Sequence, residues 1–228
     1  MKQFSDKTFF SALFQKTAAL FFPIVKCLCC GQERTLDETG LCADCAAELM
    51  GGYRPLQRKV MGKSVFGIYA YAGCGGALVR RLKFDGIRPA AVVLGNAMAA
   101  FYLEEALDAE VIVPVPVGRK RRRSRGFNQS TLLAKRIAHF TGLPVEERCL
   151  RRIRETRAQS LLEPLERFAN VDEAFLAQDV LGKRVLLVDD VITSGATIGA
   201  CIRALQKAGA AQIIGLCATV SKAGKDRA

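Results

Sequence analysis

Two adjacent carboxylates, Asp189 and Asp190, stand where they could hold a sugar phosphate. They end a run of branched apolar residues, 185–188, and a turn rich in hydroxyl groups and glycine follows at residues 193–197. The backbone N–H groups of such a turn, with the start of a following helix, offer partial positive charge to a phosphate. The carboxylates can accept hydrogen bonds from ribose hydroxyls, or hold a metal ion through its outer shell. The carboxylate pair and the following turn together predict a sugar-phosphate site.

The turn itself combines hydroxyl donors with small residues. Thr193, Ser194 and Thr197 supply the hydroxyl groups. Gly195 has no Cβ and Ala196 is nearly as small, so the backbone can come close to an anion. We therefore expect all five residues to contribute to phosphate binding.

A strand, a loop and a helix must position these groups. Residues 185–188 are typical of a buried strand, and apolar residues recur afterwards at helical spacing, at Ile198, Cys201, Ile202 and Leu205. Gly209 follows the last of them, where such a helix would end. The acid pair therefore lies between a buried strand and a helix N-terminus.

Three other interpretations share parts of this pattern. A phosphate-binding P-loop is excluded, because Gly-x-x-x-x-Gly-Lys-[Ser/Thr] is absent. A response-regulator receiver needs about a hundred further residues for its sheet, and only 38 follow Asp190. The third interpretation, which remains open, is an ordinary surface strand, turn and helix whose acid pair faces water.

Four cysteines near the N-terminus have the spacing of a metal site. Cys27 and Cys30 form one Cys-x-x-Cys pair, and Cys42 and Cys45 form a second after eleven intervening residues. Four thiolates at this spacing can close tetrahedrally on one Zn²⁺, which would be structural because so small a module does not fold without its metal. Cys29 could replace Cys30 with poorer spacing, and free or disulfide-linked cysteines are the alternative.

The charge of the chain points to anionic partners. The formal net charge is +12, and two short windows concentrate it, with six cations in residues 119–125 and five in residues 148–157. Phosphorylated metabolites, nucleic acid or a membrane surface would each suit this excess. Cations in such runs can also simply face water.

The ends of the chain and its cysteine content bear on location. Residues 1–26 predict an amphipathic helix that packs on the protein body or, alternatively, attaches to a membrane surface. They are too short and too polar to cross a bilayer, and no cleavage site follows them, so we expect no transmembrane segment. Nine cysteines without an export signal favour a reducing, cytoplasmic compartment. The last residues, 221–228, are expected to be a frayed tail.

Residues 53–220 have the composition of one α/β domain, after a cysteine module at residues 27–52. Strands are expected at residues 65–72, 111–115, 171–176 and 212–220. Helical spacing at Leu78 and Leu82 places Arg80, Arg81 and Lys83 on the outward side, and further helices follow Pro89 and Gly126. Gly73-x-Gly75 lacks the third glycine of a dinucleotide-binding motif, and the lone His139 is given no catalytic role.

The acid pair and its turn resemble the ribose-phosphate motif of type I phosphoribosyltransferases, which bind phosphoribosyl pyrophosphate (PRPP). Further motifs occur in order along the chain, and with the Cys-x-x-Cys pairs they make it similar to the ComF family, which includes ComFC and GntX. These motifs are Leu82-Lys83-Phe84-Asp85-Gly86, Arg125-Gly126-Phe127-Asn128-Gln129, Arg157-Ala158-Gln159 and Arg167-Phe168-Ala169-Asn170. The resemblance covers nearly the full length, and Ser194 replaces a threonine common in relatives.

This resemblance implies a type I phosphoribosyltransferase fold with a zinc module, and a role for each part of the site. The acid pair would hold the ribose 2′- and 3′-hydroxyls and the turn would wrap the 5′-phosphate. The loop after the strand at 111–115 would bind Mg²⁺-pyrophosphate, and we assign Arg119, Lys120 and Arg125 to it because guanidinium and ammonium groups suit phosphate oxygens. Residues 150–170 would form a mobile catalytic loop.

Three hypotheses about function remain open. In the first, the chain is a ComF-type protein of natural transformation, DNA uptake or DNA utilisation that binds PRPP, contacts single-stranded DNA and works with DNA-uptake proteins. In the second, it is a nucleobase phosphoribosyltransferase of nucleotide salvage. In the third, it is a non-catalytic, zinc-dependent adaptor. The acceptor of any ribosyl transfer and the oligomeric state do not follow from the sequence.

Overall fold

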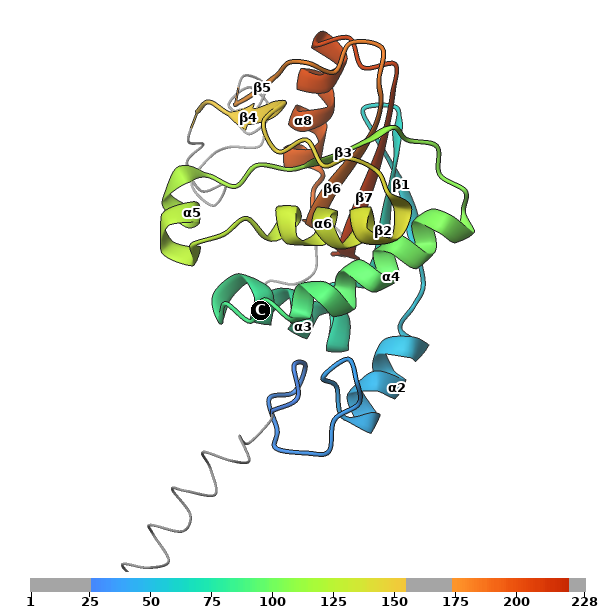
Figure 1. Ribbon diagram of the computed structural model, residues 1–228, viewed down its shortest axis with the longest axis vertical. Helices are drawn as coiled ribbons and strands as arrows, with labels where there is room; N and C mark the ends of the chain where they lie inside the picture. Colours follow the sequence, from blue (N-terminus) through green and yellow to red (C-terminus); the bar gives the residue numbers. More distant parts are fainter. Residues whose placement is uncertain (1–25, 155–173, 222–228) are drawn as a thin grey trace, which may run out of the picture.

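The fold is described from a computed structural model, which covers residues 26–154 and 174–221 (Figure 1). The predicted N-terminal helix therefore lies outside the described residues, apart from its last position. Residues 155–170 of the predicted catalytic loop also lie outside them, as does the tail beyond Ser221. The start of that predicted loop is wrong, because Leu150–Arg152 form a β-strand.

A five-stranded sheet forms the centre of the main domain. Its strand order is β1-β2-β7-β6-β3, with only β1 antiparallel to its neighbour. The strands are β1 (Leu56–Val60), β2 (Lys63–Ala70), β3 (Val111–Pro114), β6 (Arg184–Ile192) and β7 (Gln212–Val220). Because β2, β7, β6 and β3 run parallel, their carboxyl ends meet at one edge, where ligands of open α/β sheets bind.

Helices cover both faces of this sheet, as its alternating apolar side chains require (Figure 1). Leu186 and Val188 of β6 pack with buried residues of α3 (Gly73–Phe84), α4 (Ala90–Glu104) and α6 (Gln129–Thr141). Val185 and Leu187 of the same strand pack with α8 (Ala196–Lys207). The two faces of β6 therefore belong to two separate parts of the core.

Two smaller parts flank the main domain. Residues 26–42 and α2 (Ala43–Gly51) form the cysteine module, which lies next to α3 (Figure 1). The strands β4 (Leu150–Arg152) and β5 (Phe175–Ala177) form a separate antiparallel pair.

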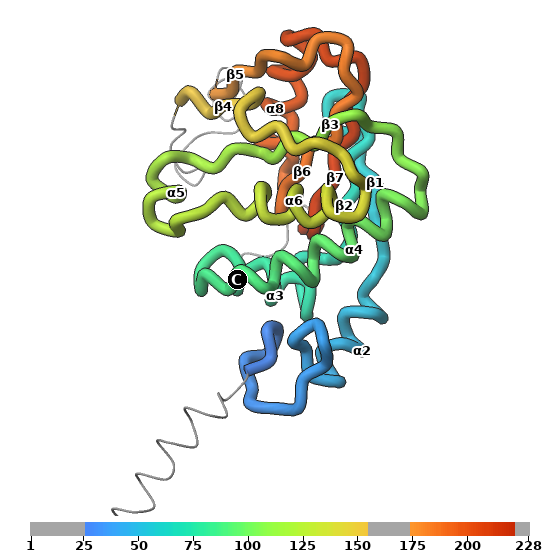
Figure 2. Tube along the Cα trace, viewed as in Figure 1, coloured from blue at the N-terminus to red at the C-terminus, as the bar shows by residue number. Residues whose placement is uncertain are grey.

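The basic window at residues 119–125 forms a helix and not the loop expected from the sequence. Helix α5 (Arg119–Arg125) follows Gly118 and ends at Gly126, which adopts φ +75 and donates its N–H to the carbonyl of Arg122. Arginine and lysine are good helix formers, and glycine in the left-handed region ends a helix at little cost. Figure 2 traces the chain from β3 out to α5 and back into α6.

The predicted architecture is confirmed, with a further local change at the acid pair. The chain has the expected α/β sheet flanked by helices, and strand, turn and helix follow one another at the acid pair. However, β6 continues through both acids to Ile192, because Asp189 lies opposite Cys217 and Val191 opposite Thr219 in the ladder with β7. The acids are thus part of the sheet rather than of the turn.

Across residues 26–154 and 174–221, no helix combines the length and hydrophobicity needed to cross a bilayer.

Helix α4 packs closely against α6, which carries Ser130, a hydrogen-bond partner of Asp189. This packing therefore helps to position the acid pair. A Cβ added at Gly95 of α4 would lie 2.6 Å from Cβ of Arg136, so we expect Gly95→Ala to lower the free energy of unfolding by about 1–3 kcal/mol. Gly51, at the end of α2, has no heavy atom within 4 Å of its added Cβ. Gly51→Ala should therefore be neutral or stabilising by up to about 1 kcal/mol. Urea unfolding measures both, and equal effects would contradict this packing.

Candidate functional site

The acid pair lies at the carboxyl edge of the parallel sheet, beside a cavity of about 360 Å³. Both side chains are buried, with Asp189 8% and Asp190 2% exposed. The cavity is lined by β6 and its turn, the segment after β3, the ends of α3 and α5, the start of α6, and β4. Six parts of the described chain therefore meet around two carboxylates.

Each carboxylate has a different partner. Asp190 forms an ion pair with Lys83, whose Nζ lies 2.7 Å from Oδ1. Asp189 Oδ1 accepts hydrogen bonds from Ser130 Oγ at 2.9 Å and from the backbone N–H of Asp190 at 2.9 Å. Asp190 Oδ2 is buried and has no hydrogen-bond partner in the described chain. A buried carboxylate oxygen without a donor is costly, so it suits a ligand that brings a hydroxyl group.

The electrostatics of the pair match its burial. Burial, followed by the charge of Asp190, raises the pKa of Asp189 to about 7, while Lys83 and Ser130 act in the opposite direction. Burial lowers the pKa of Arg125 at the same cavity, and the nearby Asp190 carboxylate opposes this effect. The single positive charge of Lys83 thus neutralises only part of the negative charge of the two adjacent carboxylates.

The turn after β6 leads directly into the N-terminus of α8. Gly195 adopts φ +80 directly before α8, a conformation in which a side chain would be strained. Thr193 and Thr197 line the cavity. Arg58 of β1 fixes the turn, because its guanidinium donates to the carbonyls of Thr193 at 2.9 Å and Ser221 at 2.7 Å.

Not all predicted turn residues reach the cavity directly. Ser194 and Ala196 are not among its lining residues. The Ser194 hydroxyl instead accepts a weak hydrogen bond, at 3.4 Å, from the N–H of Ala196. Their roles in phosphate binding stay predictions.

The three residues predicted to bind pyrophosphate lie in different places in the structure. Arg125 lines the cavity of the acid pair. Lys120 lines a second cavity, of about 630 Å³, which lies between α5 and the end of α3. Arg119 lines neither of these two cavities, whereas Arg121, which was not chosen from the sequence, lines both.

Two further site residues were missed by sequence reasoning. Lys83 was expected to face outward from α3, which is wrong, since its side chain is 14% exposed and pairs with Asp190. A lysine in the last turn of an amphipathic helix is ordinarily solvated, and only the Leu82-Lys83-Phe84-Asp85-Gly86 motif marked it. Ser130 directly follows the Arg125-Gly126-Phe127-Asn128-Gln129 motif. Asn128 of that motif caps α6 by accepting from the N–H of Ser130, and it donates to the carbonyl of Val115.

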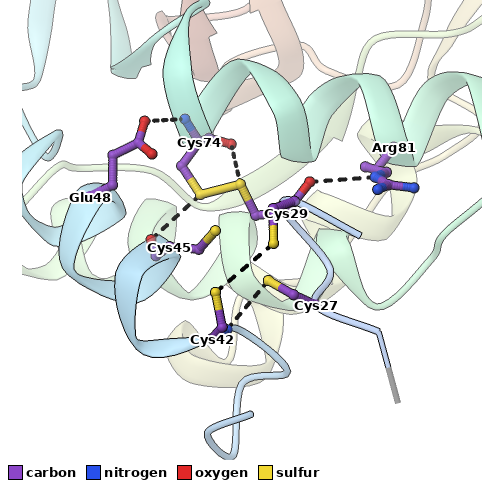
Figure 3. Close-up of a disulfide and its surroundings, with 8 residues drawn as sticks. Cys27, Cys29, Cys42, Cys45, Glu48, Cys74 and Arg81 are labelled. Carbon is purple, nitrogen blue, oxygen red and sulfur yellow. Dashed lines mark hydrogen bonds between the residues drawn. A yellow bond between two sulfur atoms is a disulfide. The ribbon is translucent and has the colours of Figure 1, made fainter. Parts of the chain in front are cut away.

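The four predicted metal ligands converge in the cysteine module (Figure 3). The sulfur atoms of Cys27, Cys30, Cys42 and Cys45 all lie within 4.8 Å of one another. Burial favours the neutral thiol of Cys27, but backbone N–H groups of Cys42, Cys30 and Cys29 outweigh it and lower its pKa to about 6. A cluster of four thiols with one easily ionised member fits a tetrahedral metal ion.

Cys29 belongs to a different contact. It forms a disulfide with Cys74, in the first turn of α3, 45 residues away in the sequence (Figure 3). Around this bond, Glu48 Oε1 accepts from the N–H of Cys74 at 2.8 Å, and Arg81 Nε donates to the carbonyl of Cys29 at 3.4 Å. The group of four converging thiols therefore contains Cys30 rather than Cys29. The disulfide and these two hydrogen bonds connect α3 to the cysteine module.

The raised pKa of Asp189 makes the stability of the fold depend on pH. In the unfolded chain an aspartate ionises near about 3.9, below the value of about 7 in the fold. Its stabilising contribution is therefore complete below about pH 4 and is lost as the pH rises to about 7. We expect the free energy of unfolding of the wild type, relative to Asp189→Asn, to fall between about pH 4 and 7 and to level off above. Urea unfolding at several pH values measures this, and a pH-independent difference would contradict it.

Comparison with known proteins agrees with this geometry. The family of the phosphoribosyl transferase domain matches residues 90–228. The DNA utilization protein YhgH of Salmonella typhi is 30% identical over 224 residues, which cover 85% of this chain and 97% of that protein. Competence protein ComFC of Streptococcus pneumoniae is 31% identical over 196 residues, 82% of this chain and 84% of that protein.

A solved structure of glutamine PRPP amidotransferase from B. subtilis aligns with 56% of this chain and 26% of its own, at 26% identity and a TM-score of 0.40. The fold is that of type I phosphoribosyltransferases, and the chain belongs to the ComF/YhgH family of proteins with a phosphoribosyl transferase domain.

Proposed function

We propose that the chain binds PRPP with Mg²⁺ in the cavity of the acid pair, and that it contacts single-stranded DNA in DNA utilisation or uptake. The observation that carries the first part is the buried pair Asp189 and Asp190 beside the turn at residues 193–197, with Asp190 Oδ2 lacking a donor among the described residues. The second part is supported by the positively charged α5 and by relatives named for DNA utilization and competence.

The two ends of PRPP meet different parts of the cavity. The hydroxyls of the ribose would donate to Asp189 and Asp190, including the unpartnered Oδ2. The 5′-phosphate would lie in the turn, held by the hydroxyls of Thr193 and Thr197 and by backbone N–H groups at the start of α8. This arrangement supplies donors to the phosphate and acceptors to the sugar within one turn of chain.

The pyrophosphate end would face the cations. Arg125 and Arg121 line the same cavity, and Arg119 and Lys120 precede them on α5. Guanidinium groups bind phosphate oxygens in bidentate fashion and stabilise the charge that develops on a leaving pyrophosphate. Mg²⁺, when bound with PRPP, would neutralise part of that charge.

The chemistry that this site supports is transfer of the phosphoribosyl group. The bond between C1 of the ribose and the pyrophosphate oxygen breaks with its electron pair on the oxygen, and C1 gains positive charge before an acceptor adds. Asp189 and Asp190 lie beside the ribose and would stabilise that positive charge.

The cysteine module would hold one structural Zn²⁺ through Cys27, Cys30, Cys42 and Cys45. Four sulfur ligands leave no open position for substrate, so the metal would serve folding rather than catalysis. Because α3 touches this module and also carries Lys83, the metal would indirectly support the acid pair.

Contact with DNA would use α5 and the cations that do not line the PRPP cavity. Every residue of α5 except Arg125 is exposed, so Arg122 and Arg123 are available to phosphates. Such contacts bind strands without sequence preference and weaken steeply with salt.

Substitution of either acid should weaken PRPP binding. Hydrogen bonds to ionised groups contribute about 1.5–3 kcal/mol, so Asp189→Asn and Asp190→Asn should each lower the affinity for PRPP with Mg²⁺ by about 10- to 100-fold. Asp179→Asn is a matched control, since Asp179 is exposed, lies outside both cavities and has φ +61, which asparagine tolerates. Isothermal calorimetry measures the affinities. Unchanged binding in both acid variants, or an equal loss in the control, would contradict the assignment.

The ligand set of the metal can be tested by exchanging neighbouring cysteines. Purified chain should contain about one zinc ion, which Cys30→Ser should lose and Cys29→Ser should keep, because only Cys30 belongs to the group of four converging thiols. Elemental analysis by mass spectrometry measures the content. Loss of zinc from Cys29→Ser with retention in Cys30→Ser would reverse the assignment.

A further inference from the structure

A second cavity opens beside the proposed PRPP site. It has a volume of about 630 Å³ and lies between α5 and the segment Lys83 to Gly86 at the end of α3. Lys83, Phe84, Arg121 and Arg125 line both cavities, so the two share a wall. A molecule in the second cavity would lie next to one in the first.

The shared wall contains an aromatic ring that the fold leaves uncovered. Phe84 is 70% exposed, the largest exposure of any aromatic side chain in the described residues. Arg125 lies over it, with Cζ 5.5 Å from the ring centroid. Exposing a phenylalanine at the mouth of two polar cavities costs solvation free energy, which is recovered when a flat apolar surface covers the ring.

The other groups of the second cavity suit a nucleotide. Lys120 and Arg121 are exposed cations that can meet phosphates. Asp85 and Ser124 offer an acceptor and a hydroxyl to the edge of a base. A Cβ added at Gly86 would meet no heavy atom within 4 Å, so this side of the cavity is open.

We propose that this cavity binds one unpaired base of a DNA strand, with the base stacked on Phe84 and an adjoining phosphate held by Lys120, which does not line the PRPP cavity. The inference rests on the proposed function, and it names where the strand enters: a base in this cavity would lie across a shared wall from the ribose of PRPP. Stacking of a base on an aromatic ring contributes to binding regardless of sequence.

The test separates base stacking from phosphate binding. The full zinc-loaded chain is titrated with a twelve-nucleotide thymidine strand and with an abasic strand of the same length. Phe84→Leu keeps an apolar side chain but removes the ring, so it should weaken the thymidine strand by about 5- to 100-fold and leave the abasic strand unchanged. The slope of affinity against salt should not change, because the phosphate contacts remain.

Phe140→Leu is the matched control. Phe140 is also an exposed aromatic, 47% exposed, with Arg136 over its ring, and it lies outside both cavities. It should leave both strands unaffected, whereas Phe84→Tyr should keep the wild-type affinity. Thymidine 5′-monophosphate should bind far more weakly than the strand.

Each other outcome has a defined meaning. Equal weakening of both strands by Phe84→Leu, or no weakening of either, would overturn base stacking. If thymidine 5′-monophosphate binds as tightly as the strand, the cavity binds free nucleotides, and the proposal that it binds a DNA strand is overturned. PRPP calorimetry on the same samples keeps the two proposals apart. If the wild type binds PRPP but Phe84→Leu does not change binding of the thymidine strand, only this inference is overturned. If the wild type does not bind PRPP, the proposed function is overturned.

Discussion

Burial of two neighbouring carboxylates at the end of β6 is the constraint on which the rest of the site depends. Removing them from water is costly, and one ion pair with Lys83 and two hydrogen bonds to Asp189 compensate only part of that cost. The raised pKa of Asp189 and the unpartnered oxygen of Asp190 are two results of this incomplete compensation. A ligand with hydroxyl groups would supply the missing donors, so the incomplete compensation of the buried charge favours binding.

Helix α3 connects this constraint with the cysteine module. Its first turn carries Cys74, which is bonded to Cys29 and donates its N–H to Glu48 (Figure 3). Its last turn carries Lys83, which pairs with Asp190. One helix therefore spans from the predicted metal site to the acid pair. A change in metal content or in the Cys29–Cys74 bond that moved α3 would move Lys83 as well, which gives the module a physical reason to accompany the domain.

The sequence allowed the fold class, the strand–turn–helix at the acid pair and the four converging cysteines to be predicted, because each depends on local spacing. It did not reveal that Lys83 pairs with Asp190, that Ser130 donates to Asp189, or that Cys29 bonds to Cys74. These contacts join segments 107, 59 and 45 residues apart. Helical periodicity also misplaced Lys83, since it separates faces of a helix but cannot show that a polar partner lies buried beside the last turn.

The central claim is that the acid pair holds the ribose of PRPP, and a crystal structure of the chain with PRPP and Mg²⁺ tests it most directly. The account predicts ribose hydroxyl oxygens within about 2.6–3.2 Å of carboxylate oxygens of Asp189 and Asp190, with the 5′-phosphate in the turn at residues 193–197. PRPP bound elsewhere, or bound in this cavity with both carboxylates directed away from the sugar, would contradict it.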